Sequence, residues 1–256
     1  LFEIPEAPTA YAFNTTLDLK AGDSLVDSSV NADPAIVPLD RFDAVFGLTT
    51  LGHFVDAICW YYYTDSLTRS YDPATDSWRF YSLIPDERRG NSFMEVISIP
   101  DGNIGKKIQV TVILGDKIPY PYAGLGVVLA SDFSTVPMNL SAMTALRLKA
   151  FGRGTVRIRH ESPILDSLAG NHQYTYILHL PQTERVIAIP VDSLFLSPAD
   201  ATVQAAYPWS RVAKSIDRIE FEFSFSNNAV GDTLNFSCDD IVIEGARLED
   251  IFTGRQ

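Results

Sequence analysis

The sequence predicts an all-β protein built as an antiparallel β-sandwich. Many short segments alternate apolar with polar side chains, which is the pattern of a strand with one buried and one outward face. The clearest runs from Arg218 to Phe225, where charged or polar residues alternate with apolar ones without a break. Turn residues separate the segments, and no long stretch shows the period of a helix. Strands joined by turns, without helices between them, favour antiparallel sheets over a βαβ fold.

The elements are expected in the following order. Residues 1–38 contain Pro5, Pro8, Pro34 and Pro38, and we expect an N-terminal extension of loops and short strands there. Residues 39–256 are expected to form the sandwich domain. Its predicted strands are 57–64, 78–84, 94–99, 107–114, 125–130, 144–151, 155–160, 173–180, 185–191, 217–225 and 234–243. Two further segments, 191–197 and 210–216, are expected to form single turns or short helices.

Charge and hydropathy narrow the classes of partner. The formal net charge is −12 with a pI near 4.7, and lysines and arginines form no cluster. Because binding to phosphate backbones requires concentrated positive charge, we expect no nucleic-acid partner and no attraction to anionic membranes. No apolar run reaches the length of about 18 residues that spans a bilayer, so no transmembrane segment is expected. The first residues also lack the basic start and apolar core of a signal peptide.

The two cysteines, Cys59 and Cys238, are far apart in the sequence and form no CxxC pair. This spacing argues against a zinc site. A disulfide between neighbouring strands and a pair of buried thiols both fit the pattern. The cysteines therefore do not indicate a compartment.

The strand at 234–243 carries two adjacent carboxylates, Asp239 and Asp240, among apolar residues. Phe236 and Cys238 share one strand parity, whereas Ile241 and Ile243 share the other. A switch of parity within one strand predicts a β-bulge, which redirects side chains. Two carboxylates there could supply oxygen ligands to calcium. Alternatively, they cap turns or pair with an arginine.

Aromatic residues are the candidates for stacking on sugar rings, because their faces are apolar and Tyr and Trp keep a hydrogen-bonding tip. In the strand 57–64, Trp60 and Tyr62 share one face and Tyr61 and Tyr63 share the other. Alternation does not say which pair enters the core. Further candidates are Tyr120, Tyr122, Tyr174, Tyr176 and Trp209. For each of them, packing in the core is the alternative.

The strand 155–160 offers charged candidates. If Val156 and Ile158 face the core, then Arg157, Arg159 and Glu161 lie on the opposite face. Planar guanidinium groups can bind neighbouring sugar hydroxyls with two donors each. A solvated or salt-bridged face is the alternative explanation of the same pattern.

Catalysis has little support in the sequence. Glu220 and Glu222 lie on one strand face, about 7 Å apart by strand rise. A glycoside hydrolase needs two carboxylates that face each other across a cleft, so we expect these two to form the solvent side of their strand. No nucleophile elbow, zinc-protease or P-loop motif occurs, and the four histidines show no metal-ligand spacing.

Several segments occur in the order found in a known group of β-sandwiches. They are Trp60–Ser66, Tyr120–Gly126, Asn139–Ser141 with Ala145–Gly152, and Cys238–Ile241. In this order they resemble the galactose-binding-like jelly rolls of carbohydrate-binding modules, those of family 11 and the related CIA30-like domain, over residues 39–245. The glycine-serine stretch that follows the aromatic strand in that group is absent, and residues 69–73 stand in its place.

The resemblance implies a jelly roll that binds a polysaccharide or oligosaccharide without catalysis, by aromatic stacking and polar contacts on its concave sheet. The residues matching that role are Trp60, Tyr62, Tyr120, Tyr122, Arg157, Arg159, Tyr176 and Trp209. It also implies a structural calcium ion, with candidate ligands Asp40, Asp43, Asp239 and Asp240. An extracellular, periplasmic or cell-surface location follows from the same resemblance. The alternatives are a protein-interaction or assembly domain of the CIA30-like kind and a jelly-roll lyase or hydrolase. The sequence leaves the glycan and the oligomeric state open.

Overall fold

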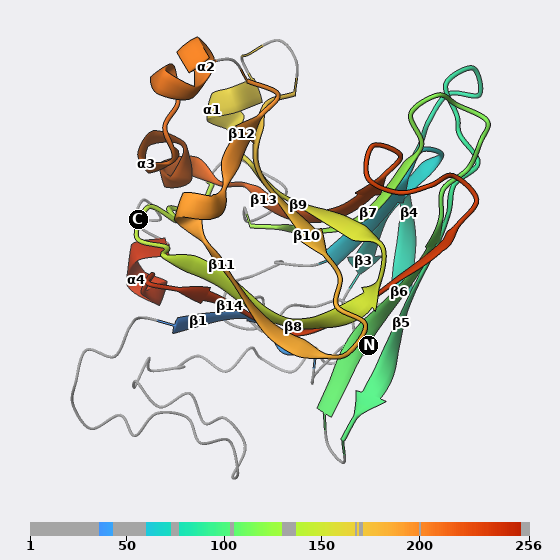
Figure 1. Ribbon diagram of the computed structural model, residues 1–256, viewed down its shortest axis with the longest axis horizontal. Helices are drawn as coiled ribbons and strands as arrows, with labels where there is room; N and C mark the ends of the chain where they lie inside the picture. The colour runs from blue at the N-terminus through green and yellow to red at the C-terminus, as the bar shows by residue number, and fades with distance from the viewer. Residues whose placement is uncertain are drawn as a thin grey trace, which may run out of the picture. The chain divides into compact units, whose positions relative to one another are not determined.

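The computed structural model describes residues 36–42, 60–72, 77–102, 105–129, 137–166, 168, 171–199 and 201–251. The chain divides into two compact units after Asp33, and every described residue belongs to the second unit. Within the described part, antiparallel strands form two sheets that pack face to face (Figure 1). The predicted antiparallel β-sandwich and its jelly-roll class are therefore confirmed.

One sheet has six strands. Its path is β11 (Arg185–Pro190), β8 (Ala145–Arg153), β14 (Thr233–Glu244), β6 (Gly105–Ile113) and β5 (Phe93–Asp101), with β1 (Ile36–Asp40) paired to the last part of β14. The other sheet has eight strands. Its order is β12 (Phe195–Ser197), β10 (Gln173–His179), β9 (Thr155–Glu161), β13 (Arg218–Ser224), β7 (Tyr122–Val128), β2 (Trp60–Thr64), β3 (Leu67–Asp72) and β4 (Ser77–Leu83).

Helices are short and lie in the connections. They are α1 (Pro163–Asp166), η3 (Val191–Ser193), α2 (Ala201–Ala206), α3 (Trp209–Val212), η4 (Ala213–Ser215) and α4 (Leu248–Ile251). The first three α-helices gather at one end of the sandwich beside β12 (Figure 1). Among the described residues, no helix has the length and apolar character needed to cross a bilayer.

The core lies between the two sheets and follows the two-residue period of the strands. From β13, Ile219, Phe221 and Phe223 point inward and are at most 1% exposed. Phe221 stacks on Phe236 of β14 with ring centroids 5.6 Å apart, which joins the two sheets at their centres. Because each strand sends alternate residues into this layer, the intervening residues of every strand lie on an outer face.

All eleven predicted strand segments contain a strand, and β1, β3 and β12 are additional. The strand β1 includes Pro38 and pairs only with β14, which fits the restriction of proline to edge positions; β12 has three residues, too few to show alternation. Within the segment 191–197, η3 is helical as expected, and Phe195–Ser197 forms the strand β12. The strand β1 crosses the domain boundary that we expected between residues 38 and 39.

The predicted bulge in β14 is confirmed. The pairing of β14 with β8 shifts register between Asp239 and Val242, and Asp240 has a φ of 47°. Asp240, in this left-handed conformation, is the extra residue of the bulge. The extra residue changes the parity of the strand, as the sequence indicated. One alternative for the cysteines is also settled: Cys238 is buried and free, so it forms no disulfide. Cys59 lies outside the described residues.

Candidate binding face of the eight-stranded sheet

The outer face of the eight-stranded sheet brings opposite charges together at its centre. On β9, Arg157 and Arg159 point outward as predicted, because Val156 and Ile158 fill the core. In the pairing with β13, Arg159 lies opposite Glu220 and Arg157 lies opposite Glu222. Directly opposed, oppositely charged residues stabilise an antiparallel strand pair.

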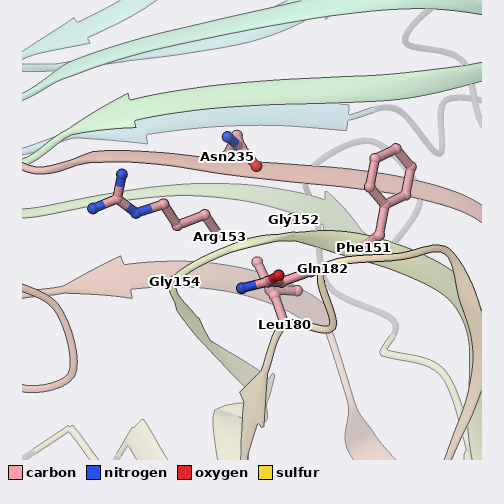
Figure 2. Close-up of a pocket in the computed structure, with 7 residues that line it drawn as sticks. All are labelled: Phe151, Gly152, Arg153, Gly154, Leu180, Gln182 and Asn235. Atoms are coloured by element: carbon pink, nitrogen blue, oxygen red, sulfur yellow. The ribbon is translucent and has the colours of Figure 1, made fainter.

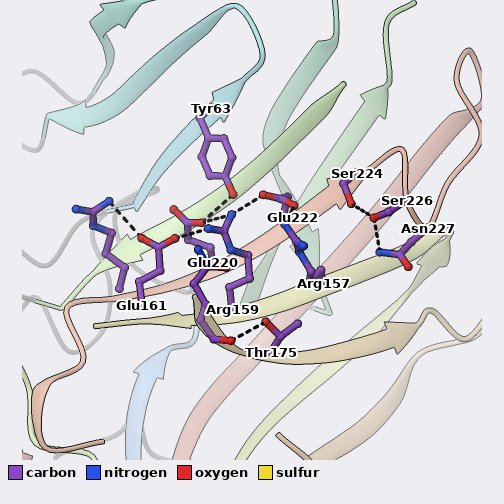
Figure 3. A network of polar contacts seen from close by, with 12 residues as sticks. Tyr63, Arg157, Arg159, Glu161, Thr175, Glu220, Glu222, Ser224, Ser226 and Asn227 are labelled. Atoms are coloured by element: carbon purple, nitrogen blue, oxygen red, sulfur yellow. Dashed lines mark hydrogen bonds and ion pairs between the residues drawn. The ribbon is translucent and has the colours of Figure 1, made fainter. Parts of the chain in front are cut away.

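These side chains form a continuous set of ion pairs (Figure 3). Arg159 Nη1 is 3.1 Å from Glu220 Oε2 and 2.5 Å from Glu222 Oε2, and Arg159 Nη2 is 2.5 Å from Glu161 Oε1. Arg157 donates to the other oxygen of Glu222. One guanidinium therefore bridges three carboxylates, and the planar donors hold them in fixed orientations.

Two tyrosines of β2 complete the set. The hydroxyls of Tyr61 and Tyr63 both donate to Glu220, the second at 3.0 Å. Their rings stack at 5.9 Å and lie over Gly126 and Gly124, their partners in β7. We call the following residues the outer-face network: Tyr61, Tyr63, Arg157, Arg159, Glu161, Arg218, Glu220 and Glu222.

Burial sets the electrostatics of this network. Burial and then the charge of Glu220 raise the pKa of Tyr61 well above its usual value, so its hydroxyl stays protonated and donates. Burial, with Glu220 adding to it and Arg159 opposing it, raises the pKa of Glu161 to about 7. Burial works against the charge of Arg159, yet the nearby carboxylates and Tyr63 raise its pKa above the ordinary value. The arginine therefore stays charged.

The close approach of Tyr61 to Gly126 gives a first testable prediction. A Cβ at position 126 would lie 2.5 Å from Tyr61 Cζ and 2.6 Å from its Oη. Because hydrogen bonding to Glu220 holds this ring in place, Gly126→Ala must displace it. We expect a loss of about 1–3 kcal/mol in the free energy of unfolding, measured by urea denaturation.

A double-mutant cycle supplies the control. In a Tyr61→Ala background the obstructing ring is gone, so adding Gly126→Ala should cost little. An equal cost in both backgrounds would show that the glycine is required for some reason other than the tyrosine.

Exposed aromatic residues lie at the end of the sheet where Tyr122 of β7 pairs with Ser224 of β13. Tyr120 is 66% exposed and Phe225 is 42% exposed, and their ring centroids are 5.1 Å apart. Tyr122 is half-buried and its ring lies 6.0 Å from that of Tyr63. We call Tyr120, Tyr122 and Phe225 the aromatic edge. It offers apolar ring surface next to the charged centre.

Four predicted stacking residues do not lie on this face, which corrects the expectation for each of them. Trp60 is 2% exposed and packs against Phe221 in the core. Tyr62 and Tyr176 share the inward parity of their strands and are partly buried against the core. Trp209 packs against the core from α3. In the aromatic strand β2 the inward pair is thus Trp60 and Tyr62, which the sequence left open.

The candidate calcium ligands are occupied by other partners. Asp40 is 1% exposed and accepts hydrogen bonds from the indole N–H of Trp60 at 2.6 Å and the backbone N–H of Phe42 at 2.9 Å. Asp240 Oδ2 is 2.6 Å from Lys149 Nζ. Burial, with the charge of Asp240 adding to it, raises the pKa of Asp239 to about 7.

No group of three or more His, Cys, Asp or Glu side chains is placed to hold a metal ion in the described part of the chain. The described aspartates therefore do not fit a calcium ion by themselves. The fourth candidate, Asp43, lies outside the described residues.

The sequence interpretation missed Glu220, Glu222 and Phe225. The two glutamates were expected to be solvated, but they are 5% and 4% exposed. The signal that could have revealed them is the match between two alternating pairs, Arg157 and Arg159 in one strand and the glutamates in another. Nothing in the local pattern distinguishes Phe225 from an inward-facing residue, because it follows the strand.

Searches by sequence match no family profile and no curated protein. Comparison with solved structures does find similar chains. The family 11 carbohydrate-binding module of the cellulosomal cellulase Lic26A-Cel5E of Clostridium thermocellum aligns over 84% of this chain and 98% of its own length, with 14% identity and a TM-score of 0.51. This chain has the fold of that module.

A second structure of a family 11 module from Clostridium thermocellum, in complex with a β-1,3-1,4-mixed-linked tetrasaccharide, covers 85% of this chain and 99% of its own, with 15% identity and a TM-score of 0.49. The module with the TM-score of 0.51 confirms, at the level of the fold, the family 11 resemblance seen in the sequence motifs. The likeness spans nearly the whole of the module.

Proposed function

We propose that this protein is a non-catalytic carbohydrate-binding module and that the outer face of its eight-stranded sheet binds a polysaccharide or oligosaccharide. The observation that carries the proposal is the set of fixed polar groups on one sheet face, with exposed rings at the adjoining strand ends. The ring of Tyr63 in the network lies 6.0 Å from that of Tyr122, and Tyr120 and Phe225 form an exposed ring pair at the same ends of β7 and β13. The fold shared with a family 11 module supports the same proposal.

The proposed mechanism divides the work between the two parts of the face. Sugar rings stack on the aromatic edge, while hydroxyls hydrogen bond to the accessible edges of Arg157 and Arg218, which are 28% and 45% exposed. Because each of these guanidinium groups is also paired with a glutamate, little side-chain freedom is lost on binding.

The network itself argues for binding rather than hydrolysis. Glu220 and Glu222 lie on the same strand face, and both are held by arginine. A glycoside hydrolase needs two carboxylates that face each other across a cleft, whereas these two lie side by side on one strand. A glycan-binding role would place the protein outside the cell, in the periplasm or at the cell surface. The structural calcium ion stays a prediction that depends on Asp43.

The test is affinity electrophoresis and calorimetry against a panel of β-glucans and hemicelluloses, including a mixed-linked β-1,3-1,4-glucan. For a glycan that binds, Tyr120→Ala should weaken affinity about tenfold, the effect of losing about 1.4 kcal/mol of ring contact. Phe93→Ala is the matched control, because Phe93 is also exposed (51%) but lies on the six-stranded sheet. Failure to bind any glycan, or equal losses in both variants, would contradict the proposal.

A protein-interaction domain of the CIA30-like kind is the second candidate. It is favoured by the burial of the central tyrosines, since Tyr61 and Tyr63 are only 8% and 9% exposed and offer little ring surface to a sugar. In that case the aromatic edge would be a protein contact. Absence of glycan binding combined with loss of a protein partner in Tyr120→Ala would identify this function.

A further inference from the structure

A pocket lies at the corner where two connections pass from one sheet to the other. The end of β8 contributes Gly152 and Arg153, the β8–β9 connection contributes Gly154, and the β10–β11 connection contributes Leu180 and Gln182. Two backbone hydrogen bonds join these connections: Gly152 N donates to Pro181 O at 2.8 Å, and Leu180 N donates to Gly154 O at 3.1 Å. The pocket is therefore built from fixed backbone rather than from a free loop.

The pocket has the size of a small-ligand site. Its volume is about 390 Å³, near the lower end for small-molecule pockets, which suits one or two sugar rings. Gly152 forms part of its lining at a φ of 153°, and a Cβ there would lie 2.1 Å from Asn235 O. The close approach of the β14 backbone thus excludes a side chain at this position.

Amide and guanidinium groups surround this hollow. Figure 2 shows Asn235 and Gln182 on opposite sides of the backbone segment that carries Gly152, with the side chain of Arg153 extending from that segment. Each amide supplies both donors and acceptors, and a guanidinium supplies planar donors. Together these groups match the alternating donors and acceptors of sugar hydroxyls.

An apolar wall completes the pocket. Leu180 and the half-buried ring of Phe151 provide it, and Lys107 Nζ lies 5.2 Å from the centroid of that ring. The apolar C–H face of a pyranose suits such a wall. A ligand with both an apolar face and a hydroxylated rim would use all parts of the lining.

The charges favour a neutral ligand over an anion. Of the described residues that line the pocket, Arg153 alone is charged, and Asp232 Oδ2 lies 3.6 Å from its Nη2. Lys107, at the ring of Phe151, is paired with Asp101 at 3.0 Å and Glu184 at 2.8 Å. The nearby cations are thus balanced by carboxylates, so an anion would find no surplus positive charge.

We propose that this corner pocket is a second carbohydrate site that takes a single neutral pyranose ring, such as the end of a chain. The choice of ligand class rests on the proposed function, but the site is separate from the outer-face network. Phe151, Arg153 and Asn235 lie on the outward parity of the six-stranded sheet, on the other side of the core from that network. Two such sites would let one module contact two glycan chains and bind with higher avidity.

The test is a titration of the ¹⁵N-labelled protein with methyl β-glucopyranoside, methyl β-galactopyranoside and methyl α-mannopyranoside, followed by NMR. For at least one of them we expect saturable shifts of the Gly152 and Gly154 amides and of the side-chain amides of Gln182 and Asn235, with a Kd of about 1 mM or weaker. The double variant Arg153→Ala/Gln182→Ala should weaken this binding at least about tenfold. Both side chains are exposed, so the fold should be retained.

Arg185→Ala is the matched control, because Arg185 is exposed in the adjoining strand and does not line the pocket. Its titration should equal that of the unchanged protein. The proposal is overturned if no pyranoside gives saturable shifts at the pocket, or if the double variant and the control respond alike.

Failure of the proposed function would be distinguishable from failure of this site. Titration with longer β-glucan oligosaccharides tests the outer face through the chemical shifts of the Gly124 and Gly126 amides. Tyr120→Ala should reduce the changes in those shifts and leave the changes at the pocket amides unaltered. Chemical-shift changes at the pocket amides without changes at Gly124 and Gly126 would support the corner pocket as a site and contradict glycan binding by the outer face.

Discussion

Glu222→Gln is expected to lower the free energy of unfolding by about 3 kcal/mol at neutral pH. The side chain of Glu222 is 5% exposed, and its carboxylate receives hydrogen bonds from both Arg157 and Arg159. A glutamine would turn its NH₂ group toward one of these donors and would remove the negative charge that balances them. The largest part of the expected cost is therefore the arginine charge left without its partner in a poorly solvated site.

The position of Arg159 prevents the side chain from recovering its hydration when Glu222 is replaced. Its side chain is 13% exposed, and its guanidinium is fixed by Glu161 and Glu220 as well, so it cannot turn outward to water without breaking those pairs. Arg157 is 28% exposed and can recover part of its hydration. Breaking a buried pair by removing one partner typically costs more than the pair contributes, since the remaining charge is unpaired.

Glu244→Gln is the matched control for this prediction. Glu244 pairs with Arg147 at 2.5 Å on the six-stranded sheet, but the two side chains are 27% and 31% exposed. Partly solvated pairs contribute about 1 kcal/mol or less. Urea denaturation of both variants measures the difference, and a cost for Glu222→Gln no larger than that for Glu244→Gln would show that the outer-face network is effectively solvated.

Strand periodicity was sufficient to predict most of the fold. In β9 and β13 one face is apolar and the other charged, so local alternation alone assigns the inward residues. The bulge at Asp239 and Asp240 was visible for the same reason, because a change of parity within an apolar strand has few other causes. The strands that were missed are short, proline-containing or polar, and their place in the sheet depends on their partners.

The candidate site could be predicted only in part, because it depends on which strands become neighbours. In β2 both faces are aromatic, so alternation cannot distinguish Trp60 from Tyr61. Their assignment depends on Gly124 and Gly126 in β7, which leave room for tyrosine rings on one face only. The burial of Glu220 likewise depends on the pairing of β13 with β9 and on two tyrosines from a third element. Such pairings join positions far apart in the sequence, and a single sequence does not record them.

Replacement of His160 is expected to remove a large part of the acid sensitivity of this fold. His160 is 0% exposed on the inward face of β9, with its ring 5.5 Å from that of Trp209 in an edge-on contact. Burial lowers the pKa of this imidazole to about 4, although a backbone contact with Tyr174 acts in the opposite direction. The folded protein therefore keeps the ring neutral well below the ordinary histidine pKa.

The sign of the effect follows from proton binding. In the unfolded chain the imidazole takes up a proton near pH 6.5, whereas in the folded chain it does so near pH 4. Between these values the unfolded state binds more protons, so stability is lost as the pH falls from about 6.5 to about 4. This single group should contribute a loss of about 2–3 kcal/mol between pH 7.5 and pH 4.5.

The comparison is made between slopes rather than absolute stabilities, because a new side chain at a fully buried site also changes packing. His160→Phe keeps an aromatic ring beside Trp209, and His160→Leu does not, so their stabilities at pH 7.5 should differ. Both lack the titrating imidazole, and both should lose about 2–3 kcal/mol less than the unchanged protein on acidification.

Two other groups titrate over the same range. The pKa values of Glu161 and Asp239 are raised to about 7 in the folded protein, so these two groups add to its stability as the pH falls. They are present in all three proteins, so their contribution cancels in the difference. Denaturation curves at the two pH values would contradict the prediction if both variants kept the slope of the unchanged protein, since His160 would then be accessible to protons in the folded state.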